Sequence, residues 1–129
     1  APLFHGRMLA EAAPRSDDSV LIVSCGSDYL PALVRAACGN VTVVSADDAA
    51  KGVTGTYSLV LVDGAIEHLP DGLAAALAEG GRIVTGLVER GVTRLAAGRK
   101  VGAAVSLLPL ADMGIPALPG FAAPKSWSF

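Results

Sequence analysis

The sequence lacks several features that would direct a protein to a membrane, to nucleic acid or to export. No apolar run approaches the ~20 residues of a membrane-spanning helix, although hydrophobic residues make up 52% of the 129 positions. A net charge of −2 and the absence of a basic stripe argue against nucleic acid as a partner. The first residues show neither an initiator Met nor a signal-peptide pattern. We therefore expect one globular domain over 1–129, bound to neither membrane nor nucleic acid.

Cysteine and histidine are scarce, and this limits the chemistry that the chain can perform. Cys25 and Cys38 fall in or beside core-like segments, so we expect reduced thiols and a cytoplasmic location. Neither has a His or a cationic residue at a telling spacing, which argues against a thiol nucleophile. His5 and His68 are distant in sequence and have no companion ligands. We expect each His to lie at the surface or to bond locally, and we predict no metal site.

The sequence does contain short apolar runs that alternate with helical patterns. Unbroken runs typical of strands buried on both faces occupy 19–24, 41–45, 58–63 and 82–88. Helical spacing predicts helices over 29–38 and from Pro70 to Leu77, the second ended by 79–81, and the polar stretch from Asp48 to Thr56 is too short for both a helix and a strand. Segments 92–99 and 102–108 indicate a closing antiparallel hairpin. This order predicts an α/β fold with a doubly wound, mostly parallel sheet.

The tail, residues 109–129, contains four prolines, which exclude long regular elements. It also contains Phe121, Trp127 and Phe129, which are three of the six aromatic residues in the chain. Disordered tails are usually poor in aromatic residues. We therefore expect this Pro-rich tail to pack on the domain or on a neighbouring chain.

Four stretches in this order resemble the protein-L-isoaspartate O-methyltransferases, in particular a short bacterial branch. The matching stretches are V-L-I-V-S-C-G-S-D-Y at 20–29, Y-S-L-V-L-V-D-G-A-I-E at 57–67, L-A-E-G-G-R-I-V at 77–84 and P-A-L-P-G-F at 116–121. Residues 1–18 would then hold a remnant of the helix that leads into the first strand. The resemblance implies a truncated, Rossmann-like class I methyltransferase fold. It also implies S-adenosylmethionine at the carboxyl ends of the strands and methyl transfer to the α-carboxylate of isoaspartyl residues.

The resemblance also assigns cofactor-binding positions, and most of them carry altered residues. The three loop glycines of the family fall at Ser24, Gly26 and Asp28, of which only Gly26 is a glycine. The acid that holds the ribose hydroxyls falls at Ser45, and Asp47 would need a shifted loop to replace it. A side chain at a positive-φ position costs roughly 1–2 kcal/mol, and a hydroxyl cannot replace charge-assisted hydrogen bonds to the ribose. We therefore expect a degraded cofactor site.

Two further carboxylates and Asp28 admit both a functional and a structural interpretation. Asp63 and Glu67 match the D-G-A-x-E pattern of the family, which implies a carboxylate facing the cofactor or the substrate. The structural alternative is a turn at the strand end for Asp63 and a charge at a helix start for Glu67. For Asp28, the structural alternative is a cap on the helix that follows.

The sequence leaves three functions open. The first is a methyltransferase homologue with impaired turnover, and the second is an active methyltransferase whose pocket a partner chain completes. The third is a non-enzymatic interaction module, in which the missing third strand and outer helices expose a sheet edge that a homodimer would cover. We favour the first and third together.

Overall fold

The computed structural model describes residues 2–118 and 121. The elements are α1 (Pro2–Ala12), β1 (Ser19–Ser24), α2 (Tyr29–Arg35), β2 (Asn40–Ser45), α3 (Ala46–Lys51), β3 (Tyr57–Ile66), α4 (Asp71–Ala75), β4 (Leu77–Glu89), β5 (Val92–Val101) and β6 (Ala104–Asp112). Six strands form one sheet in the order β2-β1-β3-β4-β5-β6. Strands β2, β1, β3 and β4 pair in parallel, and β5 pairs antiparallel with both β4 and β6. The predicted fold class and the closing hairpin are confirmed.

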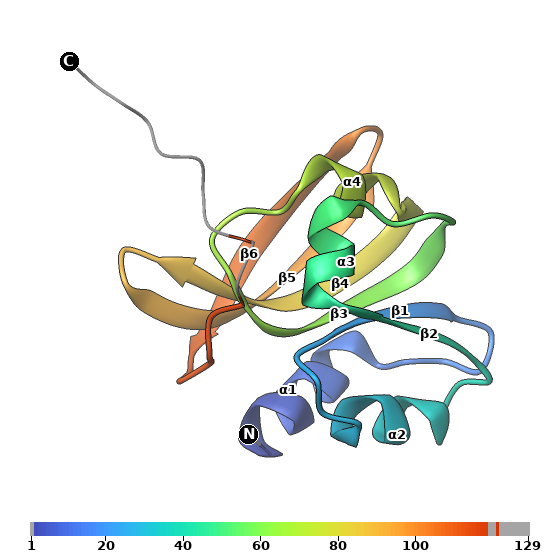
Figure 1. The fold of residues 1–129 in the computed structure, drawn as a ribbon, viewed down its shortest axis with the longest axis horizontal. Helices are drawn as coiled ribbons and strands as arrows, with labels where there is room; N and C mark the ends of the chain where they lie inside the picture. Colours follow the sequence, from blue (N-terminus) through green and yellow to red (C-terminus); the bar gives the residue numbers. More distant parts are fainter. Residues whose placement is uncertain (1, 119–120, 122–129) are drawn as a thin grey trace.

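Two helical layers cover the two faces of the parallel strands, and the alternation of side chains along β1 shows why. Val20 and Ile22 pack in one apolar cluster with side chains of α1 and α2. Leu21 and Val23 pack in a second cluster with side chains of α3 and α4. Figure 1 shows α1 and α2 on one face of the sheet and α3 and α4 on the other. Because both faces of β1 are buried, its sequence is an uninterrupted apolar run.

Several elements differ in length from the sequence-based prediction. Helix α2 ends at Arg35, and the short helix α3 takes up part of the stretch before Thr56, which we expected to be too short for both a helix and a strand. Helix α4 ends at Ala75, before Glu79-Gly80-Gly81, because Leu77 already belongs to β4 and pairs with Tyr57. Strand β3 continues past Asp63 to Ile66.

The predicted irregular tail begins later than expected, because β6 continues through Pro109 to Asp112. Proline is tolerated there because β6 is an edge strand with only one neighbour. The register shifts where Ala96 pairs with Pro109 and Leu95 with Ala111, which leaves Leu110 as the extra residue of a bulge. Beyond β6, Phe121 is buried, as expected. Trp127 and Phe129 lie outside the described residues.

Two glycines allow an unusually close approach of backbone at the carboxyl end of the sheet. A Cβ on Gly86 would lie 2.7 Å from the Gly64 carbonyl oxygen, and a Cβ on Gly64 would lie 2.5 Å from Cγ of Leu118. The register between β3 and β4 shifts in this region, between Leu61 and Ala65. Segment 116–118 uses the available edge: the Ala65 amide donates to the Pro116 carbonyl at 2.8 Å, and the Leu118 amide donates to the Ala65 carbonyl at 2.9 Å.

The amino end of the sheet depends on a polar cluster around Asp18. Its carboxylate accepts hydrogen bonds from the Arg82 guanidinium at 2.9 Å, the Arg15 amide at 2.8 Å and the Ser58 hydroxyl at 2.8 Å. Arg82 Nε also donates to the Ala12 carbonyl at the end of α1. The cluster therefore joins α1 and the start of β1 to β3 and β4.

Loss of charge on Asp18 should weaken the fold in acid. The Arg82 hydrogen bond, followed by those from Arg15 and Ser58, lowers the pKa of Asp18 from 3.8 to about 2, although burial opposes this. A depressed pKa stabilises the fold above the unfolded value, and this contribution, about 1–2 kcal/mol after allowance for solvent screening, is lost as the pH falls from about 4 to about 2. In urea unfolding, the deficit of Asp18→Asn relative to wild type should shrink over this range. The exposed neighbour Asp17→Asn is the control and should show no such change.

Substitution of Gly86 should test the close backbone contact. Because a new Cβ would clash with backbone atoms of Gly64 and Ala65, we expect Gly86→Ala to lower the free energy of unfolding by about 1–3 kcal/mol. Gly39→Ala is the matched control, since a Cβ there meets nothing within 4 Å. Equal stability of the two variants in chemical denaturation would contradict this account.

Candidate functional site

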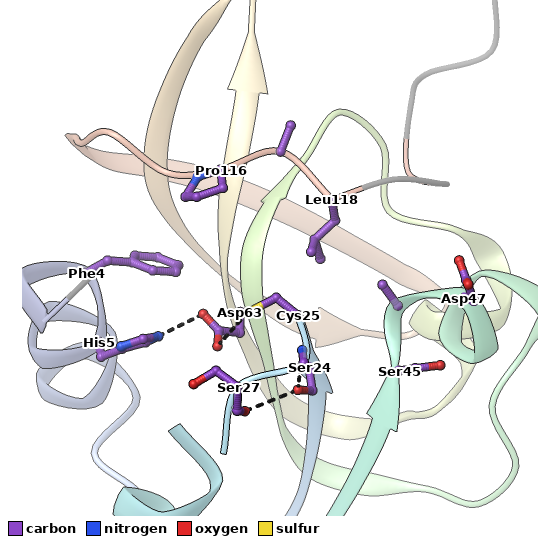
Figure 2. A pocket seen from close by; sticks show the side chains of 13 residues that line it. Phe4, His5, Ser24, Cys25, Ser27, Ser45, Asp47, Asp63, Pro116 and Leu118 are labelled. Atoms are coloured by element: carbon purple, nitrogen blue, oxygen red, sulfur yellow. Dashed lines mark hydrogen bonds and ion pairs between the residues drawn. The ribbon is translucent and has the colours of Figure 1, made fainter. Parts of the chain in front are cut away.

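A cavity of about 550 Å³ opens at the carboxyl ends of β1, β2 and β3. Its walls come from five segments, namely 4–5 of α1, 24–27 after β1, 45–47 at the junction of β2 and α3, Asp63 of β3, and 116–118. Figure 2 shows Pro116 and Leu118 on one side of the space, with Asp63 and Cys25 opposite them. Strand β1 lies between β2 and β3 in the sheet, so the chain crosses from one side of β1 to the other on its way from β2 to β3. The cavity therefore lies at the switch point where open α/β sheets bind ligands.

Five of the six predicted cofactor positions line this cavity: Ser24, Gly26, Ser45, Asp47 and Asp63. The structure thus brings together residues from three strand ends that are up to 39 positions apart in the sequence. The sixth, Asp28, is exposed and is not among the lining residues.

The structure corrects both expectations for Asp28, namely a backbone cost and a side-chain cap on the helix. Its φ of −88° is an ordinary value for any residue, so the expected steric cost is absent. Asp28 stands at the N-cap position of α2, but its side chain makes no capping hydrogen bond. The hydroxyl of Ser27 accepts the Tyr29 amide instead, at 3.2 Å.

The loop after β1 satisfies its own polar groups. Gly26 has a φ of +106°, a conformation that favours glycine. Its amide donates to the Ser24 hydroxyl at 3.0 Å, and this hydroxyl donates to the Ser27 carbonyl at 3.4 Å. Ser24, which stands at a position where the resemblance predicts a loop glycine, therefore accepts a hydrogen bond from an amide of its own loop.

The hydroxyl of Ser45 also bonds to a nearby backbone amide. It accepts the Asp48 amide at 3.1 Å and so caps α3, which is a common role of serine at a helix start. Asp47 follows in the first turn of α3, at the rim of the cavity, and is exposed. Figure 2 shows both side chains on the same side of the cavity, away from Phe4 and His5.

Asp63 is the centre of a buried polar group that the sequence did not reveal. It lies within β3, not in a turn, and is 6% exposed. One carboxylate oxygen pairs with His5 Nε2 at 2.8 Å, and the other accepts the Cys25 thiol at 3.4 Å. His5 is therefore neither at the surface nor locally bonded, contrary to our expectation, because α1 packs it against a strand 58 residues away. His68, by contrast, is exposed.

The remaining chemistry-bearing residues lie outside the cavity. Glu67 is exposed, and its amide donates to the Phe121 carbonyl at 3.0 Å. It precedes the start of α4 at Asp71, so the helix-start interpretation is wrong. Cys38 is buried in the cluster that includes α1 and α2, where its thiol donates to the Arg15 carbonyl, and burial raises the pKa of this thiol. Within 2–118 and 121, no group of three His, Cys, Asp or Glu side chains could hold a metal ion.

Sequence reasoning missed Phe4, His5, Cys25 and segment 116–118 as parts of the site. Only the fold joins these segments, and no local spacing marks them. The P-A-L-P-G-F match was a signal that 116–121 mattered, but not that it would cover the strand ends.

Among the helices described, none is long and apolar enough to cross a membrane.

Comparisons with known proteins place this geometry in a known fold. No protein-family model and no curated protein matches the sequence. A solved protein-L-isoaspartate O-methyltransferase (beta-aspartate methyltransferase) from Plasmodium falciparum, in complex with S-adenosyl-L-homocysteine, superposes with a TM-score of 0.70 at 16% identity, over 93% of this chain and 75% of that one. A second protein-L-isoaspartate O-methyltransferase gives a TM-score of 0.78 at 15% identity, over 94% of this chain. This chain spans only 48% of that second protein. The chain therefore has the fold of the protein-L-isoaspartate O-methyltransferases that its sequence motifs resemble.

Proposed function

We propose that this chain is a protein-L-isoaspartate O-methyltransferase-like protein that binds S-adenosylmethionine weakly and transfers methyl groups poorly. The observation that carries the proposal is the hydrogen bond that the Ser45 hydroxyl accepts from the Asp48 amide. Ser45 stands where the family has the acid that holds the ribose, and its hydroxyl already caps α3. The free cysteines Cys25 and Cys38 support a cytoplasmic location as part of the same proposal.

The expected weakness of binding comes from the ribose end of the site alone, because Asp28 imposes no backbone cost. A charge-assisted hydrogen bond is worth about 1.5–3 kcal/mol. The loss of a single bond of this kind therefore weakens binding about 10- to 150-fold. Asp47 does not offset this loss by itself, since it lies at the exposed rim, in the first turn of α3.

Restoring the acid should restore affinity. Aspartate caps helices as well as serine does, and its second oxygen would remain available to the ribose. We expect Ser45→Asp to tighten S-adenosylmethionine binding about tenfold or more in calorimetry. Ser45→Asn, which keeps the cap but adds no charge, should leave the affinity nearly unchanged. Wild-type binding tighter than about 50 µM would contradict the proposed weakness.

The alternative of an active enzyme completed by a partner chain makes a different prediction. We expect wild-type protein to incorporate little labelled methyl into an isoaspartyl peptide, because the cofactor site is weak at any protein concentration. If a partner copy completes the pocket, incorporation per chain should instead rise steeply as the protein concentration increases. An efficient reaction would replace our proposal with that alternative.

One observation favours an additional role as a dimerising module. Strand β2 forms one edge of the sheet, and its valine-rich sequence suits a strand buried on both faces, yet no residue in it is fully buried. Val43 is 37% exposed. Exposed edges of this kind are usually covered, and a two-fold homodimer is the commonest cover.

Sedimentation velocity should detect this dimer at micromolar protein concentration. A charged residue on an edge strand opposes pairing, so Val43→Lys should give a monomer. Val101→Lys is the matched control, because Val101 is also exposed but lies at the end of β5. A wild-type monomer at these concentrations would count against the dimer.

A further inference from the structure

The strongest unassigned feature of the cavity is the buried carboxylate of Asp63. Asp63 is 6% exposed, yet it contributes to the cavity wall. A carboxylate offers about four acceptor sites, and the contacts with His5 and Cys25 use two of them. Asp63 therefore keeps capacity for a donor or a cation that enters the cavity.

His5 reaches this carboxylate through one ring nitrogen only. Its Nε2 faces Asp63, while its buried Nδ1 has no hydrogen-bond partner among the described residues. The imidazole therefore contacts Asp63 through Nε2 alone, and Asp63 is the buried acidic group of the cavity wall.

The rest of the cavity is suited to a cation and not to an anion. Asp47 adds a second carboxylate at the rim, and no Lys or Arg occurs among the described residues that line the space. The amide of Gly26, a lining residue, already donates to the Ser24 hydroxyl. Phe4, Pro116 and Leu118 add apolar surface. A ligand with a carboxylate would therefore meet like charges and no free cationic partner.

We propose that this cavity selects an organic cation that carries the nucleoside of the proposed cofactor but no carboxylate, with Asp63 as its acidic anchor. The inference rests on the proposed function, because it names the ligand class of the same pocket. It also gives a second reason why the amino-acid portion of S-adenosylmethionine is disfavoured there.

Four related ligands test the inference by calorimetry on the wild-type chain. They are S-adenosylmethionine, S-adenosylhomocysteine, decarboxylated S-adenosylmethionine, and methylthioadenosine, which has neither the carboxylate nor a charge. We expect the decarboxylated cation to bind about tenfold or more tightly than S-adenosylmethionine, since it removes the repelled group. It should also bind more tightly than methylthioadenosine, because only the cation interacts with the charge on Asp63.

A variant then tests the anchor itself. Asp63→Asn should weaken the decarboxylated cation about tenfold or more and leave methylthioadenosine within about threefold. Asp28→Asn is the matched control, since Asp28 is an exposed acid outside the cavity wall. If Asp63→Asn does not fold, the comparison of the four ligands on wild type still decides the matter.

The outcomes separate this inference from the proposed function. Weak binding of all four ligands overturns the inference alone and leaves the weak cofactor site in place. S-adenosylmethionine binding at low micromolar concentration, more tightly than its decarboxylated form, overturns both. Equal affinity for the cation and for methylthioadenosine overturns the role of Asp63.

Discussion

The contact between the backbones of Gly64 and Gly86 determines how the carboxyl end of the sheet is built. Because Gly86 has no side chain, β4 lies close to the backbone of β3 where their register shifts, and because Gly64 has none, Leu118 packs directly on it. The end of β3 is then free to pair with 116–118, through the amide and carbonyl of Ala65. That pairing places Pro116 and Leu118 opposite Asp63 (Figure 2). The cavity therefore depends on two glycines that contribute no side chain to it.

Serine hydroxyls around the cavity accept hydrogen bonds from backbone amides of their own turns. Backbone amides at strand ends are available to ligands only while nothing inside the protein accepts their hydrogen bonds. Here Ser24 accepts the amide of Gly26, Ser27 accepts that of Tyr29, and Ser45 accepts that of Asp48. Each serine stabilises its own turn. Of these three amides, only that of Gly26 belongs to a residue that lines the cavity, and its hydrogen bond to Ser24 removes a donor from the site.

The sequence was sufficient for the parallel strands, which follow from local patterns, and the family resemblance supplied five of the residues that line the cavity. Buried runs such as 19–24 leave little choice of structure, and the strand ends carry Ser24, Ser45 and Asp63 into one place. Asp28 was misjudged because its position in the motif does not determine its φ, which the short helix α2 sets. His5 was misjudged because its partner lies on β3, and no periodicity in α1 indicates a contact across 58 residues.

The closure of the cavity could not be predicted for a related reason. It needs the shift in register after Leu61, and register depends on the packing of the whole sheet. The motif at 57–67 locates Gly64 but does not show that Leu118 will pack against it. Conversely, the Asp18 cluster is built from ordinary charged residues that no motif distinguishes, although it joins α1 to β1, β3 and β4.

The proline in β6 has a consequence for how copies of this chain can associate. Pro109 offers no N–H, and the bulge at Leu110 interrupts the ladder beside it. The β6 side of the sheet is therefore a poor template for another strand, whereas β2 presents a regular backbone. A sheet that accepts strands on one side only cannot extend indefinitely. Edge-to-edge growth would stop after two chains, as a closed pair, and not continue into a filament.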